Sequence, residues 1–323
     1  MQDQDSPLSP APEQAQAPWE REALNTLLTS MLKEQRAARR WKVVLRLMWL
    51  LLAGVLVWSL VSYNTPSVNP ATPHTAMVAI KGEIGDGMEA SAENVMAAMR
   101  SALDDEGSRA LVLLINSPGG SPVQAGLIYD EIRRLRKLHG KPIYAVVEES
   151  CASAAYYIAS ATDKIYVDKA SIVGSIGVLM DGFGFTGLMD KLGVERRLLT
   201  AGENKGFLDP FSPQTAKQRA HAQTMLDAIH TQFIAAVRQG RGERLKETSD
   251  MFSGLFWTGE QAVEMGLADG LSSLDAVARE VVDAPEVVDY TRSENMAERL
   301  AKRFGAAVGE GAVHTLQWRM PLR

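Results

Sequence analysis

From residue 77 onward, short apolar segments with the character of β-strands alternate with longer amphipathic segments of helical periodicity. Some strand segments are apolar almost throughout, and such segments are typical of parallel strands buried on both faces of a sheet. The pattern therefore predicts an α/β domain in which crossover helices join the strands of a parallel sheet. We expect strands at residues 77–84, 109–116, 142–147, 164–167 and 197–200, and helices at residues 93–102, 127–138, 153–161 and about 215–238.

A separate apolar segment, LMWLLLAGVLVWSLV, occupies residues 47–61. With its flanks it reaches about 20 apolar residues, enough to cross a hydrocarbon core of ~30 Å as a helix. Six basic residues and one acidic residue lie between Lys33 and Arg46. This pattern predicts one membrane anchor over residues 41–63, with a cytoplasmic N-terminus and the remainder across the membrane. A buried core helix or a cleavable signal peptide fits less well, because the segment is apolar on all faces and follows a long charged region.

The anchor divides the chain into parts of different composition. Residues 1–40 are expected to be a cytoplasmic segment that is partly disordered, since its first part is rich in Gln, Pro and Ala. Residues 64–76 contain three prolines and are expected to be an extended linker. The folded domain is predicted to span residues 77–290, followed by a C-terminal tail at residues 291–323.

Composition argues against several classes of function. The single cysteine, Cys151, excludes an intramolecular disulfide and a metal site built from several thiolates of one chain. The five histidines are scattered without an HExxH pair, which argues against a zinc enzyme. A net charge of −5 argues against nucleic acid as the main partner, and no Walker motif implies ATP. We expect no metal and no cofactor.

Residues that could take part in catalysis follow the predicted strands at their carboxyl ends, where ligands bind in sheets of this kind. Gly119 and Gly120 could aim backbone N–H groups at an oxyanion, because no Cβ blocks the approach. Ser153 opens a helix, where the dipole favours developing negative charge. Lys205 lies in a glycine-flanked loop and could act as a general base if desolvation keeps its amine neutral.

Each of these residues also has a commoner structural explanation. The glycines could form a plain tight turn after Pro118, the serine could be an N-cap, and the lysine could be a solvated surface residue. Their placement at successive strand ends is what favours a shared chemical role.

The joint pattern resembles the signal peptide peptidase SppA family over roughly residues 77–290. The resemblance is carried by SPGGS at residues 117–121, SCASAAYY at 150–157, GSIGV at 174–178, AGENKGFLDPFSP at 201–213, GRG at 240–242, GLFWTGEQA at 254–262 and GLAD at 266–269. It implies a membrane-anchored serine peptidase with a ClpP/crotonase-like fold, in which residues 77–290 are the peptidase domain.

The resemblance also implies the roles of individual residues. Ser153 would be the nucleophile and Lys205 the general base, with Ser175 orienting the lysine. An oxyanion hole would be formed by Gly119 or Gly120 together with the backbone of Ala154.

The resemblance extends to partners and location. Family members are typically homo-oligomers with active sites shared between adjacent protomers, so the resemblance implies a homo-oligomer of this kind. Whether Ser153 and Lys205 pair within one chain or between two chains stays open. Cleaved signal peptides and other apolar peptides are the implied substrates. The expected location is the cell inner membrane, with a single pass through residues 41–63 in contact with lipid and the catalytic domain on the periplasmic side.

The chain departs from the family pattern next to the serine. Two glycines usually follow the nucleophile, where this chain has Ala154 and Ala155. Their methyl groups are expected to narrow the site or shift substrate choice. Cys151 stands where the family usually has a small residue.

Several rival sites are weaker. Cys151 as nucleophile would need a nearby base, and no histidine is adjacent in the sequence. A GxGxxG match at residues 182–187 contains two bulky phenylalanines and lies in mid-chain. A ClpP-like triad would need His139 or His221, and both lie in or beside surface-patterned helices. A crotonase-type acyl-CoA enzyme shares the fold but not the expected location, since CoA is cytosolic. A catalytically inactive, membrane-bound peptide-binding scaffold of the same fold stays open as the alternative function.

Overall fold

The computed structural model describes residues 41–55 and 72–292, which belong to two compact units divided between residues 67 and 68. Residues 41–55 form a helix whose apolar side chains are exposed. Among the described residues, no helix is both long enough and apolar enough to cross a membrane. The end of the predicted anchor, at residues 56–63, lies outside the described residues. So do the segment 1–40, residues 64–71 of the predicted linker and nearly all of the predicted tail.

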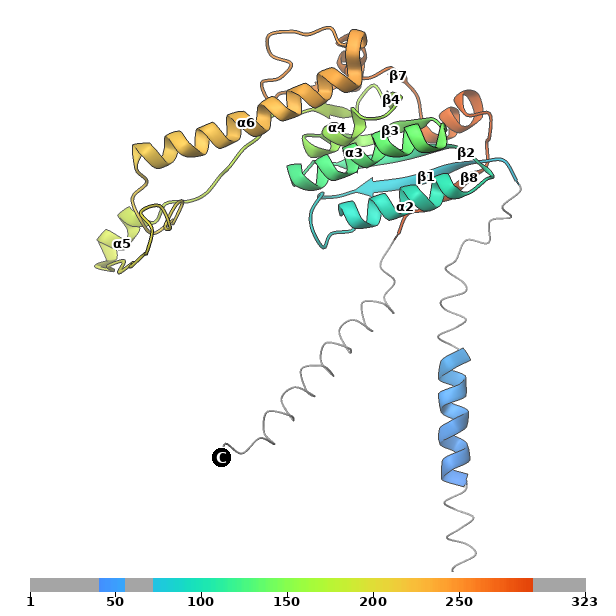
Figure 1. Cartoon of the computed structure of the whole chain (residues 1–323), viewed down its shortest axis with the longest axis horizontal. Coiled ribbons are helices and arrows are strands. Elements are labelled where there is room, and N and C mark those ends of the chain that lie inside the picture. The colour runs from blue at the N-terminus through green and yellow to red at the C-terminus, as the bar shows by residue number, and fades with distance from the viewer. Residues whose placement is uncertain (1–40, 56–71, 293–323) are drawn as a thin grey trace, which may run out of the picture. The chain divides into compact units, whose positions relative to one another are not determined.

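The second unit is built on a mostly parallel sheet (Figure 1). Its strands are β1 (His74–Lys81), β2 (Ser108–Ser117), β3 (Ile143–Ala152), β4 (Lys164–Val167), β5 (Ile172–Gly174), β6 (Phe256–Thr258), β7 (Gly270–Leu271) and β8 (Val287–Asp289). The main order is β6-β5-β3-β2-β1-β8, while β4 pairs with β3 and β7. Every pair is parallel except β5 with β6. The predicted α/β domain with a parallel sheet is therefore confirmed.

Helices connect the strands and begin at the residues that local chemistry favours. They are α2 (Ala92–Asp104), α3 (Pro122–His139), α4 (Ala154–Ala159), α5 (Thr186–Leu192), α6 (Ala216–Arg241), α7 (Gly259–Glu264) and α8 (Leu274–Ala276), followed by the π-helix η2 (Val277–Val281). Ser91, Ser121 and Thr215 cap α2, α3 and α6 by accepting a backbone N–H from the first turn. Gly140 ends α3 in the left-handed conformation, which costs glycine little.

Alternate residues of the central strands enter two apolar layers. Leu111, Leu113 and Ile115 of β2 belong to the larger core, which also contains the inward faces of α2, α3 and α4. Val112 and Leu114 belong to a smaller core that Val277 of η2 completes. The sheet is thus covered on both faces, as its continuous apolar strands require.

The predicted strand at residues 197–200 is wrong. That segment lies outside any helix or strand in a stretch, residues 177–232, that contains no buried residue. Leu199 is 97% exposed. An apolar segment becomes a strand only when a neighbouring strand can pair with it, and the sheet offers none at this position.

A buried carboxylate ties α2 to α3. Glu131 accepts from Arg100 Nε at 2.6 Å and from Arg134 Nε at 2.7 Å, and its side chain is 8% exposed. The Arg134 hydrogen bond, with help from Arg100, outweighs burial and lowers the pKa of Glu131 to about 2.

Replacing Glu131 with glutamine should lower the free energy of unfolding by roughly 1–3 kcal/mol at neutral pH. Because folding lowers the pKa of Glu131, its ionised carboxylate stabilises the fold fully at pH values above the ordinary pKa of 4.5. This contribution is lost as the pH falls toward 2. Urea unfolding at pH 7 and at pH 3 measures the difference, which should shrink at the lower pH. The control is Glu280→Gln, which breaks an exposed ion pair with Arg279 and should change little. An equal loss for both variants at pH 7 would contradict the assignment.

Candidate functional site

Ser153 lies in a tight turn between the end of β3 and the start of α4. Its backbone has φ 53° and ψ −121°, in a region that residues with a side chain rarely adopt. Its N–H donates to the carbonyl oxygen of Gly174 at 2.9 Å. Such a conformation persists only where the surrounding structure enforces it, and it commonly occurs at functional sites.

The hydroxyl of Ser153 does not have the structural role that serines before helices usually have. Ser91 and Ser121 use their side chains to cap α2 and α3. Ser153 makes no capping hydrogen bond at α4. The N-cap explanation therefore fails for this serine, and its hydroxyl stays available at a partly exposed position.

The loop after β2 packs directly against Ser153. A Cβ on Gly119 would lie 2.7 Å from the Cβ of Ser153 and 3.0 Å from the Ala154 nitrogen, so only glycine fits there. Gly120 forms a β-bridge with Ile84, and a Cβ at this position would lie 2.1 Å from the Ile84 oxygen. Both glycines have positive φ, which is the conformation that favours glycine.

The amides of this loop differ in their hydrogen bonding. Gly119 N–H donates to the hydroxyl of Ser117 at 3.1 Å, whereas no acceptor for Gly120 N–H lies among the described residues. Ala154 N–H is the first amide of α4 and has no intrahelical acceptor. In the described part of the chain, the amides of Gly120, which follows Gly119, and of Ala154, which follows Ser153, thus both remain free to donate. The buried Ser117, which no sequence motif singled out as a contact of this loop, is the acceptor of the Gly119 N–H.

Ser175 reaches the same place through its neighbour. It follows Gly174, which accepts the Ser153 hydrogen bond, and its own N–H donates to the oxygen of Leu255 at 2.8 Å. Like Ser153 it has a positive φ, of 50°, and is partly exposed. The structure therefore brings together the two serines, the two glycines and Ala154.

Lys205 lies elsewhere. It occupies a turn in which its N–H donates to Gly202 O at 3.1 Å, and its side chain is exposed. Residues 177–232 form an arm that projects from the sheet domain (Figure 1). The segment between α5 and α6 lies at the far end of this arm, remote from α4. No hydrogen bond or ion pair joins the amine to the described part of this chain.

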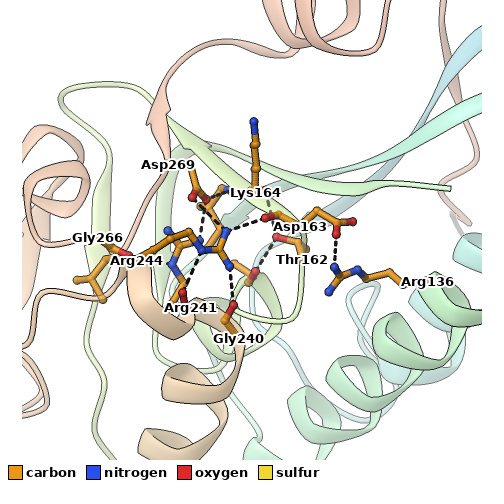
Figure 2. A network of polar contacts seen from close by, with 12 residues as sticks. Arg136, Thr162, Asp163, Lys164, Gly240, Arg241, Arg244, Gly266 and Asp269 are labelled. Atoms are coloured by element: carbon orange, nitrogen blue, oxygen red, sulfur yellow. Dashed lines mark hydrogen bonds and ion pairs between the residues drawn. The ribbon is translucent and has the colours of Figure 1, made fainter. Parts of the chain in front are cut away.

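The arm is attached to the domain through the C-terminal half of α6. Arg241 is 1% exposed and donates to Gly266 O at 2.9 Å and to Asp269 at 2.7 Å. Asp269 also accepts from Arg244 at 3.1 Å and from Ile165 N–H at 2.7 Å (Figure 2). Burial alone would raise the pKa of Asp269, but the Arg241 hydrogen bond and charge hold it below its usual value. This buried pair fixes the base of the helix that carries the arm.

The rival sites gain nothing from the structure. Burial raises the pKa of the Cys151 thiol, so the thiol stays protonated and packs as a core residue. His139 lies 3.7 Å from Asp104, near the C-terminal end of α3. The GxGxxG segment at residues 182–187 is on the arm, outside any strand-to-helix turn of the sheet. Within residues 41–55 and 72–292, no three His, Cys, Asp or Glu side chains gather in a way that could hold a metal ion.

Comparison with known proteins places these features in a family context. Residues 136–287 match peptidase family S49. The chain is 33% identical over 215 residues to a protein of Methanocaldococcus jannaschii whose name describes a candidate protease, covering 64% of this chain and 68% of that protein. It is 26% identical over 297 residues to the chloroplastic serine protease SPPA of Arabidopsis thaliana, covering 86% of this chain and 42% of that protein.

A higher identity is found with a protein of a different name. The Na(+)/H(+) antiporter NhaA of Brucella abortus is 46% identical over 181 residues, which are 56% of this chain. The chain covers 25% of the length of that protein. This chain therefore matches only a quarter of the protein that bears this name.

Replacing Asp269 with asparagine should lower the free energy of unfolding by about 3–5 kcal/mol, because it leaves the buried Arg241 charge without its partner. Glu243→Gln, at an exposed position beside the same helix end, is the matched control and should change stability little. Chemical denaturation of both variants provides the measurement. A loss below about 1 kcal/mol for Asp269→Asn would show that the pair does not hold the base of α6.

Proposed function

Because the chain belongs to peptidase family S49, the SppA family, we propose that it is a serine endopeptidase acting through Ser153 and Lys205. The observation that carries this proposal is the turn at Ser153, where the backbone has a positive φ. It leaves the hydroxyl free of a capping role, next to the Ala154 amide and to the Gly119–Gly120 loop; neither Ala154 N–H nor Gly120 N–H has an acceptor among the described residues. A nucleophile beside unpaired donors is the arrangement that acyl transfer needs.

The proposed reaction is hydrolysis through an acyl-enzyme. The neutral amine of Lys205 takes the proton of the Ser153 hydroxyl as the oxygen attacks a peptide carbonyl. The Gly120 and Ala154 amides stabilise the oxyanion, so Gly120 rather than Gly119 is the proposed loop donor. Lys205 then gives its proton to the leaving amine as the C–N bond breaks. A water molecule hydrolyses the ester in the second half-reaction and restores the Ser153 hydroxyl. Ser175 would orient the lysine.

The position of Lys205 supports a site shared between copies of the chain. Its amine is exposed on the arm and has no partner in the described chain, while Ser153 is on the sheet domain. The arm carries large apolar side chains in solvent, including Leu179 at 80%, Phe183 at 81% and Leu199 at 97% exposure. Exposed apolar groups on this scale mark a protein interaction surface. We propose that the arm packs on an adjacent protomer and supplies Lys205 to its Ser153, in a homo-oligomer.

Substrates and location follow from the same proposal. Cleaved signal peptides and other apolar peptides are the proposed substrates, because they would be released beside a membrane-anchored enzyme. The anchor is proposed at residues 41–63, of which residues 41–55 form a helix with exposed apolar side chains. The preceding basic residues would keep the N-terminus cytoplasmic and place the peptidase domain on the periplasmic side of the inner membrane.

The proposal makes a sharp prediction for pairs of inactive variants. Ser153→Ala and Lys205→Met should each abolish peptide cleavage. Of the two variants, only Ser153→Ala removes the serine with which a fluorophosphonate probe reacts. Co-expressed in one oligomer, they should restore about a quarter of the wild-type rate, because one protomer supplies the serine and its neighbour the lysine.

Two results would count against this arrangement. Absence of recovery in verified mixed oligomers would show that the dyad forms within one chain. A wild-type chain that cleaves no peptide and resists the probe would instead favour the catalytically inactive peptide-binding scaffold.

A further inference from the structure

Trp257 lies one strand away from the segment that leads into Ser153. It pairs with Val173 across the antiparallel β5–β6 contact, and β5 pairs on its other side with the end of β3. In that second pairing, Ala152 is opposite Gly174. The strand β5 therefore lies between Trp257 and the residue before Ser153.

The indole ring of Trp257 covers the backbone of Gly174. A Cβ on Gly174 would lie 2.8 Å from Trp257 Cδ1 and 3.4 Å from its Nε1. Gly174 also has a φ of +109°, so neither the space nor the backbone conformation admits another residue. The ring thus limits movement of Gly174 toward β6.

Gly174 and Ser175 are the residues on which the serine site depends. Gly174 O accepts the Ser153 N–H at 2.9 Å, and Ser175 N–H is held by Leu255 O at 2.8 Å. Ser153 and Ser175 both have positive φ. Two adjoining backbone conformations of this kind need rigid support, and Trp257 is in contact with the residue that links them.

Packing does not explain why this ring carries an N–H. Trp257 Nε1 is buried and has no hydrogen-bond partner among the described residues. An indole N–H can only donate, and an unpaired buried donor lowers stability. A side chain without an N–H donor could fill the same space with a smaller loss of folding stability, so the donor calls for a functional explanation.

We propose that Trp257 is a positioning residue for the Ser153 site, an inference that rests on the proposed peptidase function. Its ring braces the Gly174–Ser175 turn, and its N–H donates to the Ser175 hydroxyl in the assembled enzyme. A serine oxygen has two acceptor positions. One taken by Trp257 leaves the other for an N–H of Lys205, which turns the lone pair of the lysine toward Ser153.

The test separates the N–H from the ring. Trp257→Phe removes the donor and keeps an aromatic ring. Site-specific incorporation of 3-benzothienylalanine at position 257 replaces N–H by sulfur in a ring of the same size, which guards against a failure of the phenylalanine variant to fold. Both should keep or raise the melting temperature and keep the oligomer, while kcat falls about tenfold or more and KM changes little. Tyr144→Phe, which removes a polar atom from another strand aromatic, is the matched control and should keep wild-type kcat.

A double-variant cycle tests the acceptor. If Trp257 acts through the Ser175 hydroxyl, Trp257→Phe should cost little further activity in a Ser175→Ala background. Additive losses would overturn the assigned acceptor, and wild-type kcat in both Trp257→Phe and the 3-benzothienylalanine variant would overturn the role of the N–H. A loss of kcat matched by a loss of melting temperature would reduce Trp257 to a structural residue. These results are distinguishable from failure of the peptidase proposal, which Ser153→Ala with wild-type activity would show.

Discussion

The backbone turn at Ser153 is the constraint on which the candidate site depends. A serine in this conformation must be held there, and two contacts do so: the hydrogen bond to the Gly174 carbonyl and the close approach of Gly119. Both contacts come from the carboxyl ends of neighbouring strands. The register of β2, β3 and β5 therefore sets the position of the hydroxyl. Both positions require glycine, because a Cβ at position 119 would collide with the Ser153 turn itself and a Cβ at position 174 with the ring of Trp257.

A second constraint lies at the base of the arm, where α6 joins the sheet domain. α6 begins in solvent and ends in the core, where Phe233 and Val237 pack and the buried Arg241 pairs with Asp269. The GRG and GLAD motifs acquire a structural explanation from this arrangement. Gly240 lies against the Ser160 carbonyl and Gly266 against the Arg244 carbonyl, at distances that exclude a side chain. A firmly held helix base fixes the direction of the exposed arm, which the proposed shared site requires.

Long apolar strands were predictable from the sequence because their burial on both faces leaves a continuous signal. β2 and β4 agree closely with prediction, and α3 contains the predicted apolar stripe of Ile128, Ile132 and Leu135 in the core. The strands β5 to β8 have two or three residues each, too short for any periodicity. The segment 197–200 shows the opposite error, since its composition suits a strand but no partner strand is available.

The sequence by itself determined the fold class, the order of the long elements and the candidate catalytic residues, because hydrophobic periodicity and glycine placement are local properties. It also carried the motifs of the peptidase family. Tertiary structure alone decided which of these residues meet. In the folded chain, the Ser117 hydroxyl accepts the Gly119 N–H, and the Ser153 hydroxyl makes no capping hydrogen bond. The indole ring of Trp257 packs on Gly174. Tertiary structure also separated Lys205 from Ser153 within the chain. These outcomes depend on strand register and on contacts between residues far apart in the sequence, and no local pattern encodes them.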